Sequence, residues 1–278
     1  MSPLAQTFLA TLAVVLAALF VLWLLSVARQ DASIIDPFWG TGFVLVVWTA
    51  FVLNPPASLF VLWSGDFVAF GLSRSLLLAV LTTIWGVRLS LFLLCRNWGH
   101  GEDRRYQAMR AQHGQRFWWV SLISVYLLQG VILWFVSFPI QAALTAVTDS
   151  PLNWLDAIGG ALWATGVFFE TVGDWQLVRF KADPANVGRV MARGLWRLTR
   201  HPNYFGDFCV WWGVYLIAAA GGAWWTVLSP LVMSVLLLKV SGVTLLEKTI
   251  TDRRPEYAAY QTRTNAFFPG PPSRPVTP

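Results

Sequence analysis

The segment TRHPNYFGDFCVWWGVYLIAAA, residues 199–220, places a cluster of polar side chains directly before a long apolar run. The polar side chains are Arg200, His201, Asn203 and Asp207. The apolar run has the composition of a membrane-spanning helix, in which charged side chains are costly and are retained mainly for function. This segment therefore predicts a transmembrane helix whose polar end contributes to a functional site.

The composition of the whole chain is typical of a polytopic membrane protein. Of its 278 residues, 56% are hydrophobic and only 12% are charged, and the mean hydropathy is +0.56. A helix needs about 20 predominantly apolar residues to cross a bilayer. Seven segments approach that length: 8–27, 34–53, 75–94, 118–140, 154–177, 204–220 and 225–246. We therefore expect an all-α bundle of seven transmembrane helices that forms one domain, 1–270, followed by a mobile proline-rich tail, 271–278.

The distribution of basic residues predicts the orientation of this bundle. Arginine and lysine concentrate after the first, third and fifth segments and in the C-terminal tail, whereas the alternate loops contain Arg74 alone. Short cytoplasmic loops collect these residues. We therefore expect the N-terminus outside and the C-terminus in the cytoplasm.

Ionisable residues within the expected helices cluster toward the cytoplasmic side. Those on that side are Asp36, Arg88, Glu170, Asp174, Asp207 and Glu247, and Lys239 alone lies deeper. The first two carboxylates of the fifth helix are four residues apart and share a helix face, as do Asn203 and Asp207. Structural ion pairs are the alternative explanation for any one of these residues. Taken together, their clustering predicts one polar cavity that faces the cytoplasm.

The side chains around this cavity indicate a nucleotide ligand. Carboxylates accept hydrogen bonds from ribose hydroxyls and carboxamides, whereas guanidinium groups match phosphate oxygens. The loop before the sixth segment supplies the cations Lys181, Arg189, Arg193, Arg197 and Arg200. Anionic lipid headgroups are the alternative partner of this basic loop. Because no glycine-rich dinucleotide motif follows a strand, a Rossmann domain is not expected.

Three stretches resemble the steroid 5-alpha-reductase-like family of membrane proteins, in its bacterial branch. ARGLWRLTRHPNYFGDFCVWWG (192–213) resembles the family's signature, LLEKTITDRRPEYAAYQTRTNAFFP (245–269) resembles its C-terminal segment, and IIDPFWGTGF (34–43) is typical of the branch. The resemblance covers most of the chain and is strongest over 170–269. The pattern RHPxYxG is also shared by isoprenylcysteine and phospholipid methyltransferases, so it is less specific for the reaction than for the fold.

The resemblance implies a membrane enzyme that uses NADPH to reduce a carbon–carbon double bond conjugated to a carbonyl. Such an oxidoreductase acts on CH–CH groups, like a 3-oxo-5-alpha-steroid 4-dehydrogenase, and takes a lipophilic substrate from the bilayer, here the bacterial inner membrane. The cofactor enters from the cytoplasm. The implied cofactor-binding residues, completed with the polar side chains of the opening segment, are Glu170, Asp174, Lys181, Arg189, Arg200, His201, Asn203, Tyr204, Asp207, Glu247, Tyr257 and Tyr260.

The residues that would activate the substrate depart from the family's pattern. Steroid reductases carry a Gln-Glu pair in helix 2 and a tyrosine in helix 3, whereas this chain has Asp36 with Trp39 in helix 2 and Trp85 near the tyrosine's place. Hydride transfer to the β-carbon still needs a donor that stabilises the enolate and supplies a proton. We expect Asp36, kept protonated by burial, or Arg88 to be this catalytic group.

Two other functions fit part of the pattern. An S-adenosylmethionine-dependent methyltransferase of a lipid or lipidated thiol would have a related fold, but its cofactor brings no phosphate to the basic loop. Its relatives usually keep an acidic pair where this chain has Glu247 and Lys248. A non-enzymatic binding protein or transporter of an anionic amphiphile is the third hypothesis, although the paired broken helices of transporters are not evident.

Several classes of site are not expected. The three histidines include no pair four residues apart, so a transition-metal site is not predicted. Both cysteines fall at cytoplasmic helix ends, where thiols stay reduced, so no disulfide is predicted. Membrane lipids and a lipophilic small molecule are the expected partners, and nucleic acid is not. The identity of the substrate and the oligomeric state are left open by the sequence.

Overall fold

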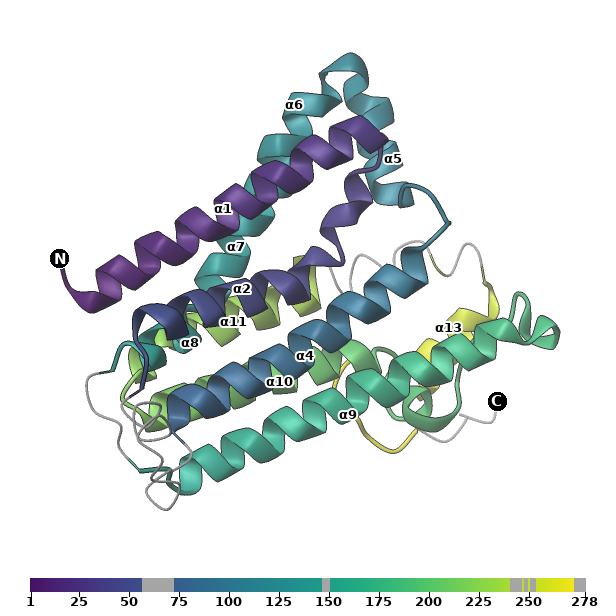
Figure 1. Cartoon of the computed structure of the whole chain (residues 1–278). Coiled ribbons are helices and arrows are strands. Elements are labelled where there is room, and N and C mark those ends of the chain that lie inside the picture. The colour runs from purple at the N-terminus through teal and green to yellow at the C-terminus, as the bar shows by residue number, and fades with distance from the viewer. Residues whose placement is uncertain (57–72, 147–150, 241–246, 248–249, 251–253, 273–278) are drawn as a thin grey trace. The chain divides into compact units, whose positions relative to one another are not determined.

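The computed structural model is helical in every regular element of the residues that it describes (Figure 1). These residues are 1–56, 73–146, 151–240, 247, 250 and 254–272. The chain divides into two compact units, one made of Met1–Asn153 with Ala218–Ser229 and the other of Trp154–Ile217 with Pro230–Pro278. The all-α class is therefore confirmed, whereas the single domain over 1–270 stays a prediction. Residues 273–278 of the expected tail lie outside the described residues.

The first unit is built on three long helices and a broken fourth. Its long helices are α1 (Pro3–Arg29), α2 (Phe38–Leu53) and α4 (Arg74–Asn97). The remaining elements are η1 (Ala32–Ile35), α5 (Arg104–His113), η2 (Gly114–Arg116), α6 (Phe117–Ser121), the π-helical η3 (Leu122–Leu127), α7 (Leu128–Val136), α8 (Phe138–Leu144) and η6 (Trp224–Val227). A side-chain cap marks the start of α1, where the Ser2 hydroxyl accepts a hydrogen bond from the Ala5 amide, as expected for a helix cap.

The second unit contains the longest helix of the chain. Its elements are α9 (Trp154–Ala182), η4 (Pro184–Asn186), η5 (Gly194–Arg197), α10 (Pro202–Ala220), α11 (Leu228–Val235), the π-helical η7 (Leu236–Val240) and α13 (Glu256–Arg263). Helix α10 begins at Pro202, where proline is favourable because the first helical position loses no hydrogen bond.

Four segments are long and apolar enough to cross a membrane. They are Pro3–Arg29, Ala32–Leu53, Arg74–Asn97 and Arg104–Val136. Only 22–44% of the most apolar window in each is buried inside the protein, so most of these apolar side chains need an apolar surrounding. The helices thus indicate a membrane protein. The fifth and sixth expected spans coincide with α9 and α10, which are helical but not among the four, so the count of seven stays a prediction.

Glycines bring the backbones of α9 and α10 into direct contact. A Cβ atom added to Gly166 would lie 2.5 Å from the Gly206 carbonyl oxygen, and one added to Gly206 would lie 2.6 Å from that of Gly166. The same holds one repeat away, where a Cβ on Gly213 would lie 2.5 Å from the Gly159 oxygen. Because Gly166 pairs with Gly206 and the earlier Gly159 pairs with the later Gly213, the two helices are antiparallel.

Sequence spacing keeps this contact on one side of α9. Glycines recur at 159, 166 and 173, a seven-residue interval that returns to the same helix face. Glu170 lies on the same buried stripe, and a Cβ on Gly206 would lie 2.7 Å from its Cγ atom. Gly206 therefore permits the close approach of α10 to α9. As a result, the carboxylates of α9 lie against the first turns of α10.

Substituting one glycine tests this helix contact. Gly166→Ala would place a methyl group against the backbone of α10, so we expect a loss of about 1–3 kcal/mol of stability, the usual cost of overpacking. Gly160→Ala on the same helix adds a methyl group where no atom lies within 4 Å. This control should be neutral or slightly stabilising, because alanine favours helix over glycine. Thermal unfolding in detergent measures both, and equal melting temperatures would contradict the close contact.

Candidate functional site

The polar site of the second unit begins with two buried carboxylates on α9. Glu170 is 2% exposed and Asp174 is 5% exposed. The side-chain amide of Asn203, in the first turn of α10, donates a hydrogen bond of 3.3 Å to Oδ1 of Asp174. Asp207 follows one turn later on α10. The structure thus brings the predicted acidic pair and the predicted amide together across the glycine contact.

The residue before this helix, Arg200, binds the C-terminal part of the chain. Its Nε and one terminal nitrogen contact the two carboxylate oxygens of Glu247 at 2.7 and 3.0 Å. Its other terminal nitrogen donates to the carbonyl oxygens of Gln261 and Thr264 at 3.1 and 2.6 Å. Four hydrogen bonds therefore engage a group that has five N–H donors.

Three further side chains converge on Glu247. His201 Nε2 lies 2.9 Å from Oε1, the Tyr257 hydroxyl donates to Oε1 at 3.1 Å, and the Gln261 amide donates to Oε2 at 3.1 Å. Burial alone would raise the pKa of the Glu247 carboxyl, but the hydrogen bonds from His201 and Arg200 hold this pKa well below its usual range. Glu247 is therefore an ionised acceptor at neutral pH.

Main-chain contacts extend this junction between α10 and the C-terminal segment. The Arg200 amide donates to the Asn265 carbonyl at 2.9 Å, and the Thr199 hydroxyl donates to the Phe267 carbonyl at 2.8 Å. Tyr260 donates its hydroxyl hydrogen to the Trp196 carbonyl and packs edge-on against Tyr257. The RHPNY segment is thus held on one side by Asp174 and on the other by the chain after Glu247.

The remaining cofactor-binding candidates lie around this junction or on the surface. Tyr204 stacks on the His201 ring with 5.5 Å between ring centres. Lys181 is exposed in the last turn of α9, and Arg189 is exposed on the segment that links α9 to α10. The main-chain oxygen of Arg189 accepts a hydrogen bond of 2.8 Å from Arg254. Their assignment to phosphate stays a prediction.

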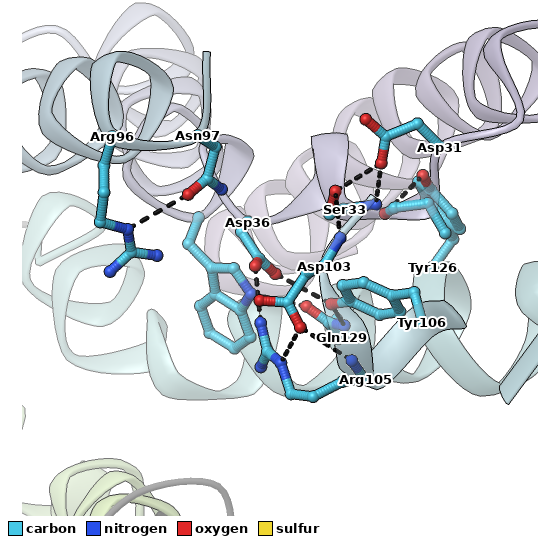
Figure 2. A network of polar contacts seen from close by, with 12 residues as sticks. Asp31, Ser33, Asp36, Arg96, Asn97, Asp103, Arg105, Tyr106, Tyr126 and Gln129 are labelled. Atoms are coloured by element: carbon cyan, nitrogen blue, oxygen red, sulfur yellow. Dashed lines mark hydrogen bonds and ion pairs between the residues drawn. The ribbon is translucent and has the colours of Figure 1, made fainter. Parts of the chain in front are cut away.

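The first unit contains a separate polar cluster around Asp36 (Figure 2). Arg105 forms an ion pair of 2.7 Å with Oδ2 of Asp36, and the Tyr106 hydroxyl donates to Oδ1 at 2.8 Å. The amide of Gln129 donates to the Tyr106 hydroxyl at 3.4 Å, and its oxygen accepts from Trp39 Nε1 at 2.6 Å. Figure 2 shows Asp36 between Arg105 and Tyr106.

Groups that can only donate fix the direction of these hydrogen bonds. Indole N–H and guanidinium groups have no acceptor, so Trp39 orients the Gln129 amide and its NH2 then faces Tyr106. The Tyr106 hydrogen must in turn point to Asp36, which also accepts from Arg105. Asp36 accepts from two donors in this arrangement, and its protonation state stays a prediction. Its catalytic role stays a prediction, but Tyr106 is the group in this cluster that holds a transferable proton.

Arg88, the second catalytic candidate, lies apart from this ion pair. It is half-buried on α4, and its guanidinium carbon lies 5.4 Å from the centre of the Phe92 ring. The cation that holds Asp36 is Arg105, not Arg88. Trp85 is 1% exposed and packs against Phe43, in agreement with a role in the core.

Sequence reasoning missed Arg105, Tyr106 and Gln129. Tyr106 lies 70 residues from Asp36 along the chain, and Gln129 lies 23 residues beyond Tyr106. Gln129 gave a usable signal, because an amide inside the apolar segment 118–140 needs a partner. Tyr106 gave no such signal, because it belongs to a basic segment that the sequence predicts to be a solvent-exposed loop.

Removing the charge of Glu247 tests whether the junction is structural. Glu247→Gln leaves the Arg200 guanidinium, 11% exposed in its side chain, without its counter-charge, and breaking a buried pair typically costs about 3–5 kcal/mol. Gln261→Ala removes only a neutral donor from the same carboxylate, so about 1 kcal/mol is expected. Thermal unfolding of the ligand-free protein in detergent measures both variants.

The pH dependence provides a second readout of the same substitution. Because folding lowers the pKa of Glu247, its contribution is fully present above the unfolded pKa of about 4.3 and declines as the pH falls toward the folded value. The stability difference between the unaltered protein and Glu247→Gln should therefore shrink below about pH 4.3. A difference that is the same at pH 7 and pH 3 would contradict the ion pair.

The chain is similar to one protein family and to a yeast protein. No solved structure gives a significant match. The uncharacterised protein C594.04c of Schizosaccharomyces pombe is 26% identical over 274 residues, which cover 90% of this chain and 76% of the yeast protein. The family described as protein of unknown function (DUF1295) matches residues 22–264, which include every candidate catalytic and cofactor-binding residue named above. The chain therefore belongs to this family, which is of the general steroid 5-alpha-reductase-like kind.

Proposed function

We propose that the protein is a membrane-embedded, NADPH-dependent reductase of a carbon–carbon double bond conjugated to a carbonyl in a lipophilic substrate. One observation carries this proposal: on α9 the buried Asp174 accepts from the Asn203 amide of α10, and the buried Glu170 lies one turn away, next to a basic segment. Buried carboxylates are rare unless they have partners or a function. The reductase proposal gives them a function.

The donor set of the second unit fits a dinucleotide phosphate. Glu170, Asp174 and Asp207 offer acceptors for ribose hydroxyls or a carboxamide, and Asn203 offers both a donor and an acceptor. Lys181 and Arg189 are exposed cations that match phosphate oxygens. When bound, NADPH supplies a hydride. The Arg200 guanidinium is engaged by Glu247 and two carbonyl groups, so its contribution would be to hold the C-terminal segment in place.

The chain must also supply a proton and stabilise negative charge on the substrate's oxygen. Tyr106 fits the first requirement better than Asp36, because its hydroxyl carries the hydrogen and the carboxylate only accepts. The Arg105 guanidinium lies 5.3 Å from the centre of the Tyr106 ring, where it would stabilise the phenolate left after proton transfer. Arg88 remains a candidate for the charge-stabilising group.

The finer topology belongs to the same proposal. We place seven spans in a bacterial inner membrane, with the N-terminus outside, the C-terminus in the cytoplasm and the cofactor reaching the second unit from the cytoplasm. The alternation of basic residues between loops supports this orientation. A reporter fused after Pro278 should then be cytoplasmic.

An S-adenosylmethionine-dependent methyltransferase is the second candidate. Its cofactor also carries ribose hydroxyls for the carboxylates of α9, but it has no phosphate for Lys181 and Arg189. Mass spectrometry of small molecules that co-purify with the protein separates the two functions directly. Recovery of S-adenosylmethionine in place of NADPH would overturn the reductase proposal.

Cofactor choice tests the proposed phosphate contact. If Arg189 contacts the 2′-phosphate, the purified protein should bind NADPH at least about tenfold more tightly than NADH, because a charge-assisted hydrogen bond contributes roughly 1.5–3 kcal/mol. Arg189→Ala should remove most of this preference. Arg263→Ala, which removes an exposed arginine of α13, should leave it unchanged. Equal binding of both nucleotides by the unaltered protein would exclude Arg189 as the reader of this phosphate.

A pair of tyrosine substitutions tests the proton donor. Tyr106→Phe should lower the turnover of a conjugated enone by about 10²–10⁴-fold, the usual contribution of a general acid, while NADPH affinity stays within twofold (roughly 0.4 kcal/mol). Tyr126→Phe is the matched control, because this buried hydroxyl donates to the Ala32 carbonyl, at 3.2 Å, and among the described residues it forms no hydrogen bond with Asp36 or Arg105. Equal turnover of the two variants would show that Tyr106 is not the donor.

A further inference from the structure

The junction between α4 and α6, residues 96–119, carries more positive charge than its own acidic residues neutralise. Helix α4 ends at Asn97 and α6 begins at Phe117, so the junction joins the end of the candidate span Arg74–Asn97 to the first part of the candidate span Arg104–Val136. Its ionisable arginines are Arg96, Arg104, Arg105, Arg110 and Arg116. Its acidic residues are Glu102 and Asp103. The junction therefore has a net positive charge where the chain meets the membrane surface.

Both acidic residues are already occupied within the junction. Glu102 forms a two-point ion pair with Arg110, at 2.8 and 2.9 Å, and accepts a hydrogen bond from the Ala32 amide. Asp103 caps α5 through the Arg105 amide and pairs with the Arg105 side chain at 2.9 Å. Burial would raise the pKa of each carboxyl, but these hydrogen bonds lower both pKa values overall. Both acids are thus ionised and committed to Arg105 and Arg110.

Arg104 and Arg116 remain for an external partner. Both side chains are exposed, and among the described residues neither makes a hydrogen bond or an ion pair. They lie at the first residue of α5 and at the last residue of η2. The ion pairs above hold the backbone between them, so their positions are fixed by the fold. Their guanidinium groups match the oxygens of phosphate groups.

Exposed tryptophans flank these arginines on both sides of the junction. Trp98 is 75% exposed, Trp118 is 53% exposed and Trp119 is 43% exposed. Trp118 is fixed in place, because its carbonyl accepts a hydrogen bond of 2.8 Å from the Trp23 indole. Tryptophan is enriched at the level of lipid headgroups, where its ring is partly apolar and its N–H stays hydrated. These side chains indicate that the arginines lie beside headgroup phosphates.

We propose that the junction of residues 96–119 binds the headgroup of an anionic phospholipid through Arg104 and Arg116, with Trp98, Trp118 and Trp119 seated among the lipids around it. This surface lies entirely in the first unit and does not depend on the proposed reductase activity. The two arginines contact the phosphate, and the net charge of the junction favours a headgroup that carries a negative charge over a zwitterionic one.

Lipid retention by the full-length protein tests this surface. The protein is placed in nanodiscs of equal parts phosphatidylglycerol and phosphatidylcholine, and the lipids that remain bound are counted by native mass spectrometry. The unaltered protein should retain phosphatidylglycerol preferentially. Arg104→Gln and Arg116→Gln should each lower this preference by about fivefold, the effect of one basic residue near an anionic surface. Arg263→Gln removes an equally charged exposed residue of α13 and should not change it.

Three results would overturn the proposal. They are equal retention of both lipids by the unaltered protein, an equal loss in Arg263→Gln, and displacement of the lipid by millimolar inorganic phosphate. The third result would assign the arginines to a soluble phosphate.

Melting temperatures in pure phosphatidylcholine should match for the unaltered protein, Arg104→Gln and Arg116→Gln, because these two arginine side chains make no internal bonds among the described residues. Should a glutamine variant fail to fold, Arg104→Lys and Arg116→Lys keep the charge without the two-point geometry and should retain most of the preference; loss of it would contradict a charge-based site.

Discussion

The backbone contact between α9 and α10 is the constraint on which the second unit depends. In a bilayer, apolar side chains gain little by leaving lipid for a helix interface, so close van der Waals packing and interhelical hydrogen bonds must hold helices together. Gly159, Gly166, Gly206 and Gly213 allow the two backbones to touch. That proximity lets Asp174 reach Asn203. The polar cluster is thus a consequence of small residues on the adjoining helix face.

The RHPNY segment serves two different tasks within a few residues. Arg200 and His201 bind Glu247 and attach the C-terminal segment to the start of α10, whereas Asn203 turns toward the carboxylates of α9. A ligand phosphate at Arg200 would have to compete with a two-point ion pair. The motif's arginine therefore acts first as scaffold, and in the proposed function the ligand chemistry would fall to its asparagine and to the acids that face it.

In the first unit, too, ion pairs between distant segments hold the structure together. Asp36 and Glu102 each take an arginine of α5 and tie this helix to the start of α2 and to η1. The same pairing leaves Tyr106 with an oriented hydroxyl hydrogen and leaves Arg104 and Arg116 facing outward. One set of ion pairs therefore generates both the candidate proton donor and the candidate lipid surface, and the loop gains a fixed shape without a hydrophobic core of its own.

The sequence by itself determined the features that depend on neighbouring residues. Apolar length predicted the helices, and the four-residue spacing of Glu170 and Asp174 predicted that the two carboxylates share a helix face. Only the tertiary structure decided the partners. Glu247 lies 47 residues from Arg200, and Arg105 lies 69 residues from Asp36. A charged residue in an apolar segment indicates that a partner is needed. The periodicity of one helix, however, does not indicate which distant segment packs against that helix.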